Sequence, residues 1–165
     1  MTLDFGTELR AALGERLTRF DRQPLDGEGL KRAAVAVTVV PHDAGAAFLL
    51  TRRAPKLNAH GGQWALPGGR LDEGEDAMEA ALREVREEVA LDLGPAQVLG
   101  MLDDYPTRSG YLITPVVIWA EDKSAMHPNE AEVASIHEIA LGELMRPDSP
   151  VFLTIPESEK PVIRL

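Results

Sequence analysis

The chain has 165 residues, of which 44% are hydrophobic and 27% charged, as expected for one globular domain with a real core. Its net charge of −10 argues against unspecific binding to a nucleic acid, but not against a small anionic substrate where metal ions and arginines reverse the local field. The absence of cysteine excludes a disulfide framework and thiol chemistry.

The sequence predicts no membrane partner. Its longest apolar run, Ala33 to Val40, is far shorter than the roughly 20 residues of a membrane span. The N-terminus lacks a signal-peptide pattern, and the final Ile-Arg-Leu lacks the small residue that begins a peroxisomal signal. We therefore expect a cytoplasmic protein.

The first third of the chain predicts a helix and a hairpin. Residues 7–20 carry apolar side chains on one helical stripe, which is typical of a packing helix. After a polar linker, residues 33–40 are apolar and β-branched, as in a buried strand that Pro41 ends. Residues 47–52 form the second strand of the hairpin.

A loop and a short segment, residues 63–66, then lead to a second helix. A Gly-rich turn at residues 67–69 lets backbone amides approach a ligand. Asp76 stands at the N-cap with Glu79 in a capping-box relation, and Gly94 with Pro95 supplies stop signals. One face of the helix is apolar through Met78, Ala81, Leu82, Val85 and Val89.

The second half of this helix is crowded with carboxylates. Glu84, Glu87 and Glu88 fall within about a third of the helix circumference, so their side chains are expected to converge. Like charges at this spacing cost roughly 0.2–0.5 kcal/mol per pair. A hard divalent cation such as Mg²⁺ or Mn²⁺ would offset that cost, because both ions prefer oxygen ligands.

These residues belong to a longer pattern, whose fixed positions are Gly69, Glu75, Arg83, Glu84, Val85, Glu87, Glu88 and Leu91. Their spacing resembles the Nudix box, G-x5-E-x7-R-E-U-x-E-E-x-G-U, in which U is bulky and apolar. Ala90 departs from the pattern, where the family usually has Gly. We expect only a small change at the helix end, unless the position needs a positive φ, which Ala resists.

The resemblance to Nudix hydrolases implies roles for the box residues. One to three Mg²⁺ or Mn²⁺ ions would bind Glu84, Glu87 and Glu88, with the carbonyl of Gly69 or Gly68 as a candidate further ligand. Arg83 would orient the carboxylates, and an ion pair is its simpler role. Glu75 would tie the loop to the helix, and its simpler role is to favour the helix N-terminus electrostatically.

Beyond this helix the pattern predicts three strands and a short helix, at residues 96–103, 111–120, 132–140 and 141–145. Pro115 interrupts the second strand and suggests a bulge or a sheet edge. Two short apolar runs flank a turn in the tail, residues 151–165. This order predicts an α/β or α+β fold, which the resemblance sharpens to a single domain, residues 1–165, forming an α/β/α sandwich with a mixed central sheet.

A second resemblance, from Leu49 to Gly69, is to the coenzyme A diphosphatase branch, whose pattern is roughly L-L-T-x-R-[SA]-x2-L-R-x-H-x-G-x-V-x-F-P-G-G. The matching residues are Leu49, Leu50, Thr51, Arg53, Ala54, Leu57, His60, Gly62, Pro67, Gly68 and Gly69. The departures are Asn58 for Arg, Trp64 for Val and Leu66 for Phe. Asn58 supplies neither the charge nor the fork of an arginine, which leaves the substrate open.

Two further segments, residues 107–117 and 128–133, are also similar to that branch, whose relatives commonly continue past the last strand into another helix. The resemblance implies substrate contacts by Arg53 and His60, against the simpler roles of a solvated strand end and a loop histidine. Arg70 and Arg108 are further candidates for substrate contact. We expect Trp64 and Leu66 to lie in the core.

The predicted reaction is metal-dependent hydrolysis of a phosphoanhydride in a nucleoside diphosphate derivative. For coenzyme A, the resemblance implies cleavage to 3′,5′-ADP and 4′-phosphopantetheine. The general base is Glu84 if it is not consumed as a ligand, otherwise a loop acid such as Glu130. Glu130 and Glu132 are loop acids by default, and each is also a candidate to contact a metal ion or the catalytic water.

Two alternatives remain open. One is a hydrolase of ADP-ribose, NADH, a dinucleoside polyphosphate or a modified nucleoside triphosphate. The other is a non-catalytic nucleotide-binding module, which would be marked by lost box acids, whereas all are present here. A homodimer is neither indicated nor excluded.

Overall fold

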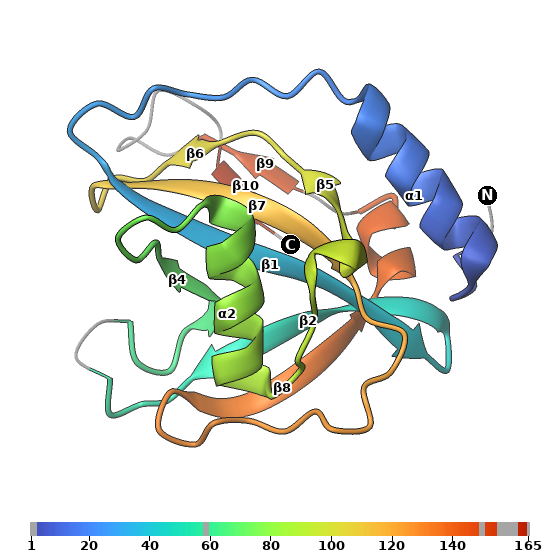
Figure 1. Cartoon of the computed structure of the whole chain (residues 1–165). Coiled ribbons are helices and arrows are strands. Elements are labelled where there is room, and N and C mark those ends of the chain that lie inside the picture. Colours follow the sequence, from blue (N-terminus) through green and yellow to red (C-terminus); the bar gives the residue numbers. More distant parts are fainter. Residues whose placement is uncertain (1–2, 58–59, 149–150, 155–161, 165) are drawn as a thin grey trace.

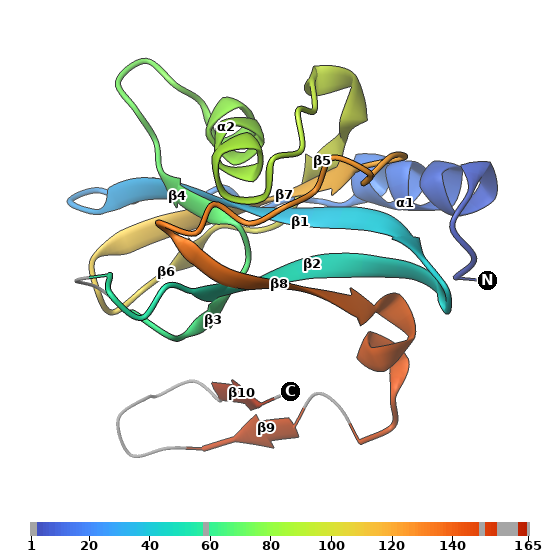
Figure 2. The ribbon, with the colours of Figure 1, turned by 90° about the horizontal axis from the view of Figure 1, so that it is seen from below.

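A mixed β-sheet with a helix on each face forms the centre of the protein (Figures 1 and 2). A computed structural model describes residues 3–57, 60–148, 151–154 and 162–164. The sheet strands are β1 (Lys31–His42), β2 (Gly45–Arg53), β3 (Trp64–Ala65), β4 (Gly68–Arg70), β5 (Val98–Met101), β6 (Tyr105–Pro106), β7 (Tyr111–Trp119) and β8 (Val133–Ala140). The helices are α1 (Thr7–Arg19) and α2 (Ala77–Val89), with 3₁₀ turns η1 (Pro95–Gln97) and η2 (Leu141–Met145). A separate pair, β9 (Val151–Leu153) and β10 (Val162–Arg164), lies on the side of the sheet away from α2 (Figure 2).

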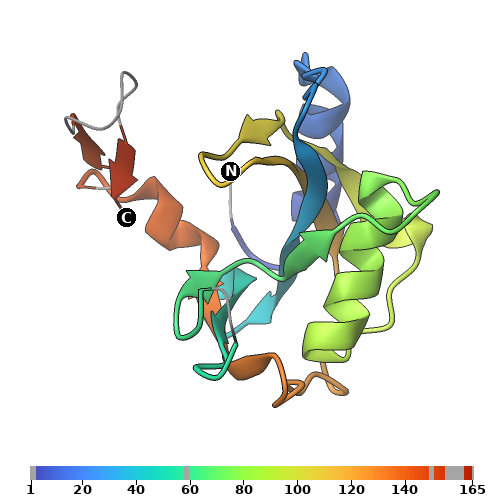
Figure 3. The ribbon, with the colours of Figure 1, turned by 90° about the vertical axis from the view of Figure 1, so that its left-hand side faces the viewer.

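The sheet has two halves, one formed by β1 with β4, β5, β6 and β7 and the other by β2 with β3 and β8, and they separate along part of their length. β1 runs parallel to the central strand β7, and every other pairing is antiparallel. β1 pairs with β2 only beside the hairpin, through residues 39–42 and 45–48. Nearer its start, β1 pairs instead with β4, while the far end of β2 pairs with β3. β8 pairs with β2 along almost its whole length, from Ala47 to Arg53. The two halves therefore diverge beside β3 and β4 (Figure 3).

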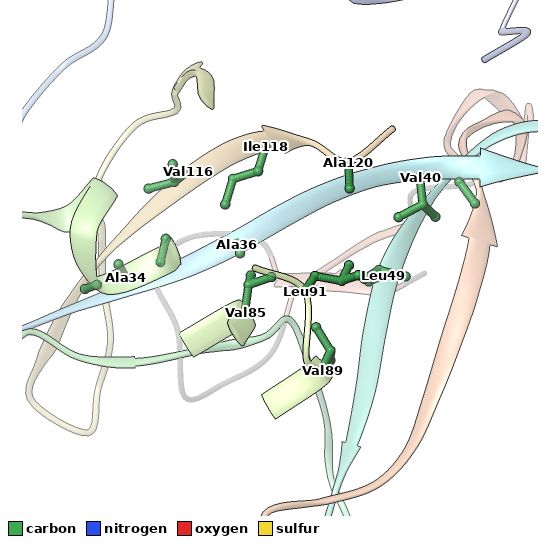
Figure 4. Packing of buried hydrophobic residues seen from close by; sticks show 13 residues of the cluster. Ala34, Ala36, Val40, Leu49, Val85, Val89, Leu91, Val116, Ile118 and Ala120 are labelled. Atoms are coloured by element: carbon green, nitrogen blue, oxygen red, sulfur yellow. The ribbon is translucent and has the colours of Figure 1, made fainter. Parts of the chain in front are cut away.

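Alternate residues of β1 and β7 supply two cores, one under each helix. Toward α2, the first core contains Ala34, Ala36, Val40, Leu49, Val85, Val89, Val116 and Ile118 (Figure 4). Toward α1, the second contains Leu9, Val39, Ala46, Val117 and Trp119, and the Trp119 ring stacks on Phe5 with centroids 4.1 Å apart. The α/β/α sandwich with a mixed sheet is thus confirmed. In the described part of the chain, no helix is long and apolar enough to cross a membrane.

Two prolines lie within strands, where the sequence predicted a strand end and a bulge or edge. β1 continues through Pro41, and Pro115 lies in β7, which has neighbours on both sides. The Pro115 carbonyl accepts from Leu102 N at 3.0 Å. Because the N–H and C=O of one strand residue point to the same side, the position where Pro115 lacks an N–H faces the gap between β5 and β6. The Val39 carbonyl accepts from Ala120 N, just after the end of β7. Pro41 lies two residues further along β1, so its backbone is directed to the same side, where β7 no longer provides a partner. The strand end predicted at Pro41 was therefore wrong. Pro115 lies at a locally unpaired position of β7, between its pairings with β5 and β6, so the strand is continuous but has a local edge there.

The predicted helices are confirmed, but α2 ends earlier than its stop signals indicated. Its last helical residue is Val89, and Ala90 follows in the left-handed region with φ 59° and ψ 27°. The Ala90 N–H donates to the Arg86 carbonyl at 3.2 Å. Ala90 therefore takes the positive φ that its Gly-like position demands, at a cost that glycine would not incur. Gly94 instead precedes η1.

Candidate active site

Helix α2 presents two glutamates at the edge of the sheet, beside β4. Its N-terminus is fixed by the predicted capping box, in which Asp76 accepts from Glu79 N at 2.8 Å and Glu79 accepts from Asp76 N at 2.9 Å. Its apolar face packs on β1 and β7. Because Glu84 and Glu88 border that buried face, they are only 8% and 3% exposed.

Three carboxylates converge at this edge. One oxygen each from Glu84, Glu88 and Glu132 lies within 4.8 Å of the others; we call these residues the acid cluster. Glu132 comes from the loop before β8, which is bonded to the end of α2 because Asn129 N donates to the Glu88 carbonyl at 2.9 Å. On the other side, Ala54 N donates to the Glu132 carbonyl at 2.8 Å.

Two of the predicted acids lie outside the cluster. The Glu87 side chain is 45% exposed and pairs with Arg83 at 3.2 Å. It points away from the cluster because adjacent residues of a helix, here Glu87 and Glu88, are about 100° apart around the axis. Glu130 is exposed on the loop, and Glu132, two residues later, enters the cluster instead. Nothing local in the sequence distinguishes these two loop acids, since only the β2–β8 pairing fixes which one faces α2.

Arg83 links the loop before α2 to the acid cluster. It donates to Glu75 at 2.9 and 3.1 Å, to Glu84 at 2.8 Å, and to the Arg70 carbonyl at 3.0 Å. The bond from Arg83 is the main reason that the pKa of Glu75 is lowered, and the same bond raises the pKa of Arg83. Glu75 also accepts from Asp72 N at 2.8 Å. Glu84 is thereby held in one orientation.

Two glycines of β4 allow the strand to lie close to the acids. A Cβ on Gly69 would overlap the Glu84 carboxylate, and a Cβ on Gly68 would overlap the Ala34 carbonyl of β1. Gly68 therefore excludes a side chain, because the backbone of β1 is in the way, whereas a side chain at position 69 would displace the Glu84 carboxylate. The backbone of Gly69 therefore lies next to Glu84 of the acid cluster.

The cluster carries more negative charge than its surroundings compensate. Burial, and then the charge of Glu84, raises the pKa of Glu88 to about 8, although Arg53 and the Gly68 N–H act in the opposite direction. Burial also raises the pKa of Glu84, against the effect of Arg83. Several hard carboxylate oxygens, crowded and short of positive charge, are the donor set that suits a divalent cation. The residues present therefore fit such an ion.

A cleft of about 480 Å³ opens between the two sheet halves. It is lined by all but one of the predicted substrate residues: Arg53, His60, Gly68, Gly69 and Arg70. Arg108 is exposed beside the cleft, and its neighbours Thr107 and Ser109 line the wall. Asn58 lies outside the described residues. Gly68 and Gly69 belong to both the cleft and the surroundings of the acid cluster, so the two sites are continuous.

The arginines of the cleft differ in their environments. Nε of Arg53 is buried without a hydrogen-bond partner among the described residues. Arg70 donates from Nε to the Tyr111 hydroxyl at 2.9 Å, and its guanidinium lies 5.3 Å from the centre of that ring. These cations make one wall of an acidic protein suitable for phosphate.

Trp64 is not in the core, contrary to the expectation from the sequence. It lines the cleft and is 52% exposed, while Leu66 is half-buried in the same wall. β3 consists of only two residues at the end of the strand order, and neither hydrophobic core of the described residues includes Trp64. The strand pattern of residues 63–66 does not show which face is covered.

Comparisons with known proteins point to one family. The family model described as NUDIX domain matches residues 31–163. An "Uncharacterized Nudix hydrolase NudL" from Pectobacterium atrosepticum is 40% identical over 139 residues, which cover 80% of this chain and 71% of that one. A protein of the same description from Yersinia enterocolitica is 38% identical over 151 residues, covering 88% of this chain and 77% of that one.

Solved structures agree in fold. A Nudix hydrolase from M. smegmatis, RenU, aligns with a TM-score of 0.54 and 29% identity, over 71% of this chain and 74% of that one. The NUDIX domain of Shewanella oneidensis NrtR, solved in complex with ADP ribose, aligns with a TM-score of 0.51 and 23% identity, over 78% of this chain and 79% of that one.

Proposed function

Because this chain belongs to the NUDIX domain family and is a Nudix hydrolase, we propose that it cleaves the phosphoanhydride of coenzyme A or a coenzyme A derivative. The observation that carries the proposal is the continuity between the acid cluster and a cleft lined by Arg53 and Arg70. The carboxylates of the cluster would bind a cation, and the arginines of the cleft would bind the phosphates of a nucleotide. The choice of coenzyme A is supported by the signature that includes Arg53 and His60, since both line this cleft.

Under this proposal Glu84, Glu88 and Glu132 hold Mg²⁺ or Mn²⁺, with the Gly69 carbonyl and Glu87 as further candidates at the rim. When bound, such an ion neutralises diphosphate charge and lowers the pKa of a water molecule. Arg83 fixes the direction of Glu84 through its 2.8 Å bond. Arg53 offers a buried, unpaired N–H, and a phosphate oxygen would satisfy that donor.

The general base must be a carboxylate beside the attacked phosphorus. Glu84 has one oxygen engaged by Arg83, and Glu132 accepts only a 3.4 Å bond from the Asn129 side chain. Glu130 is exposed and lies outside the cluster. We therefore assign the base to Glu84 or Glu132 in preference to Glu130.

The first test is a hydrolysis panel of coenzyme A, ADP-ribose, NADH and diadenosine tetraphosphate, each with Mg²⁺ and with Mn²⁺. The expected result is release of 3′,5′-ADP from coenzyme A at a higher kcat/KM than for the other substrates. The departures from the branch signature at Trp64 and Leu66 favour a second candidate, another nucleoside diphosphate derivative. A higher kcat/KM for one of the other substrates would establish that candidate and overturn the coenzyme A assignment.

The second test replaces a cluster acid without changing its shape. Glu88→Gln should lower kcat by roughly 100-fold or more, because it removes a charged ligand. Glu79→Gln is the matched control on the same helix, since glutamine still completes the capping box. If Glu88→Gln stays within a few-fold of wild type while Glu79→Gln is unchanged, the proposed metal role is wrong.

A further inference from the structure

The exposed indole of Trp64 lines the cleft. About half of its surface, 52%, is open to solvent, which is unusual for the largest apolar side chain. It is four residues from Gly68, so the two Cα atoms lie at most about 14 Å apart, a distance within the reach of a nucleoside and its phosphates. Trp64 thus shares the cleft with Arg53, Arg70 and the glycines of β4, and Gly69 borders Glu84 of the acid cluster.

The back of the indole is supported. His137 of β8 meets the Trp64 ring edge-on, with centroids 4.5 Å apart and planes 66° apart. His137 is itself held by Ser135, whose Oγ lies 2.8 Å from His137 Nε2. Trp64 and Ser135 are both cross-strand partners of Arg52 in β2. The indole is therefore fixed on one side by regular strand pairing and left open in the cleft.

We propose that Trp64 binds the nucleobase of the substrate by stacking, and that His137 is a positioning residue that holds the indole for this contact. The inference rests on the proposed nucleotide substrate and specifies which side chain of the cleft contacts the base. Stacking suits this site because any base offers a flat π-face, and Trp offers a large one at little entropic cost. The phosphates then lie along the arginines toward the acid cluster.

Tryptophan fluorescence tests the contact without turnover. The chain has two tryptophans, and Trp119 is 1% exposed and stacked on Phe5 on the α1 side of the sheet. AMP and 3′,5′-ADP, which contain a base but no phosphoanhydride, should quench the emission in a saturable manner, while ribose 5-phosphate and pyrophosphate should not. Quenching should disappear in Trp64→Leu and persist in Trp119→Phe. Equal quenching by ribose 5-phosphate, or quenching that survives in Trp64→Leu, would overturn the proposal.

Steady-state kinetics with the best substrate of the panel give a second readout. Trp64→Leu should raise KM roughly tenfold and change kcat less than threefold, since a stacking contact of this strength acts mainly on binding. Trp64→Phe, which keeps an aromatic face, should stay within threefold of wild type in KM. If Trp64→Leu leaves KM within twofold, the indole does not hold the base, whatever the panel has shown about the reaction.

The positioning role of His137 predicts a distinct set of changes in KM and kcat. His137→Ala should raise KM toward the Trp64→Leu value with kcat unchanged, and His137→Phe, which restores an aromatic edge, should recover it. A loss of kcat in both variants, or a normal KM in His137→Ala, would contradict the role. The fluorescence assay remains decisive even if no panel substrate is hydrolysed, so failure of the proposed reaction and failure of this inference are distinguishable.

Discussion

At the scale of single residues, the acid cluster is defined by where the backbone places each carboxylate. Glu84 and Glu88 follow from helical spacing, and the sequence therefore identified them. Glu132 joins them only because β8 pairs with β2 and bonds its loop to both Ala54 and α2. No local pattern contains that information, which is why Glu130 was chosen from the sequence.

The two loop acids are distinguishable by substitution. Glu132→Gln should lower kcat/KM by roughly 100-fold, because it removes a charge from the cluster. Glu130→Gln should remain within about threefold of wild type, since that side chain is exposed and outside the cluster. Purified variants assayed side by side with Mg²⁺ provide the measurement. A larger loss in Glu130→Gln than in Glu132→Gln would reverse the assignment.

The raised pKa of Glu88 makes the stability of the metal-free protein depend on pH. The unfolded carboxyl loses its proton near pH 4.5, whereas the folded one keeps it to about pH 8. The folded state therefore binds the extra proton between these values, and its stability falls as pH rises, by up to about 1.4 kcal/mol per pH unit.

Urea unfolding in EDTA between pH 6 and pH 8 measures this slope. We expect stability to decrease with pH, Glu88→Gln to reduce the slope, and Mg²⁺ to restore stability at pH 8. A flat profile for the wild-type protein in EDTA would show that Glu88 titrates near its ordinary pKa.

At the scale of elements, α2 shows both what local sequence determines and where it fails. The N-terminal capping box and the apolar face were predictable because they depend on residues three and four apart. The C-terminal end was not, because Gly94 offered a conventional stop signal while the chain turns at Ala90. Leu91 is 3% exposed in the core under α2, and its burial fixes the turn directly before it.

The left-handed conformation of Ala90 predicts a stabilising substitution. Ala90→Gly should increase the free energy of unfolding by about 0.5–1 kcal/mol, because glycine avoids the Cβ penalty at φ 59°. Gly94→Ala is the matched control: φ there is −114°, so it should be neutral or slightly stabilising. Urea unfolding of the two variants would contradict this reading if Ala90→Gly were less stable than wild type.

At the scale of the whole molecule, the strand order explains both the position of the cleft and why proline is tolerated within β1 and β7. The two sheet halves separate beside β3 and β4, and Pro115 faces the gap between β5 and β6. Such gaps are consequences of strand order and do not appear in a strand's own residues. The fold class was predictable from the Nudix box, whereas the exposed wall that contains Trp64 was not.

A buried carboxylate is one of the groups that attach the segment after α1 to the sheet. Asp104 accepts from Leu25 N at 2.9 Å and from Thr114 Oγ1 at 2.7 Å, and it pairs with Arg22. Burial alone would raise the pKa of Asp104, but the bonds from Thr114 and Leu25 and the charge of Arg22 outweigh it and lower the pKa. The stabilisation is therefore present above the unfolded-state pKa and is lost as pH falls through the folded one.

Asp104→Asn should destabilise the protein by about 1–3 kcal/mol at pH 7. The substitution removes the negative charge and puts an amide NH₂, a donor, opposite groups that themselves donate, Leu25 N, Thr114 Oγ1 and the Arg22 guanidinium. Asp26→Asn, in the same segment but exposed, should have no measurable effect. Urea unfolding at pH 7 gives both values. Equal stability of the two variants would show that Asp104 does not hold this segment in place.

The central claim is that a net-acidic protein gathers Glu84, Glu88 and Glu132 around a divalent cation beside its cleft. The most direct measurement is anomalous diffraction from crystals soaked in Mn²⁺, collected on both sides of the manganese absorption edge. Our account predicts a manganese peak within coordination distance of carboxylate oxygens from all three residues. Ordered carboxylates without a peak between them, pointing apart or paired with arginine, would contradict it.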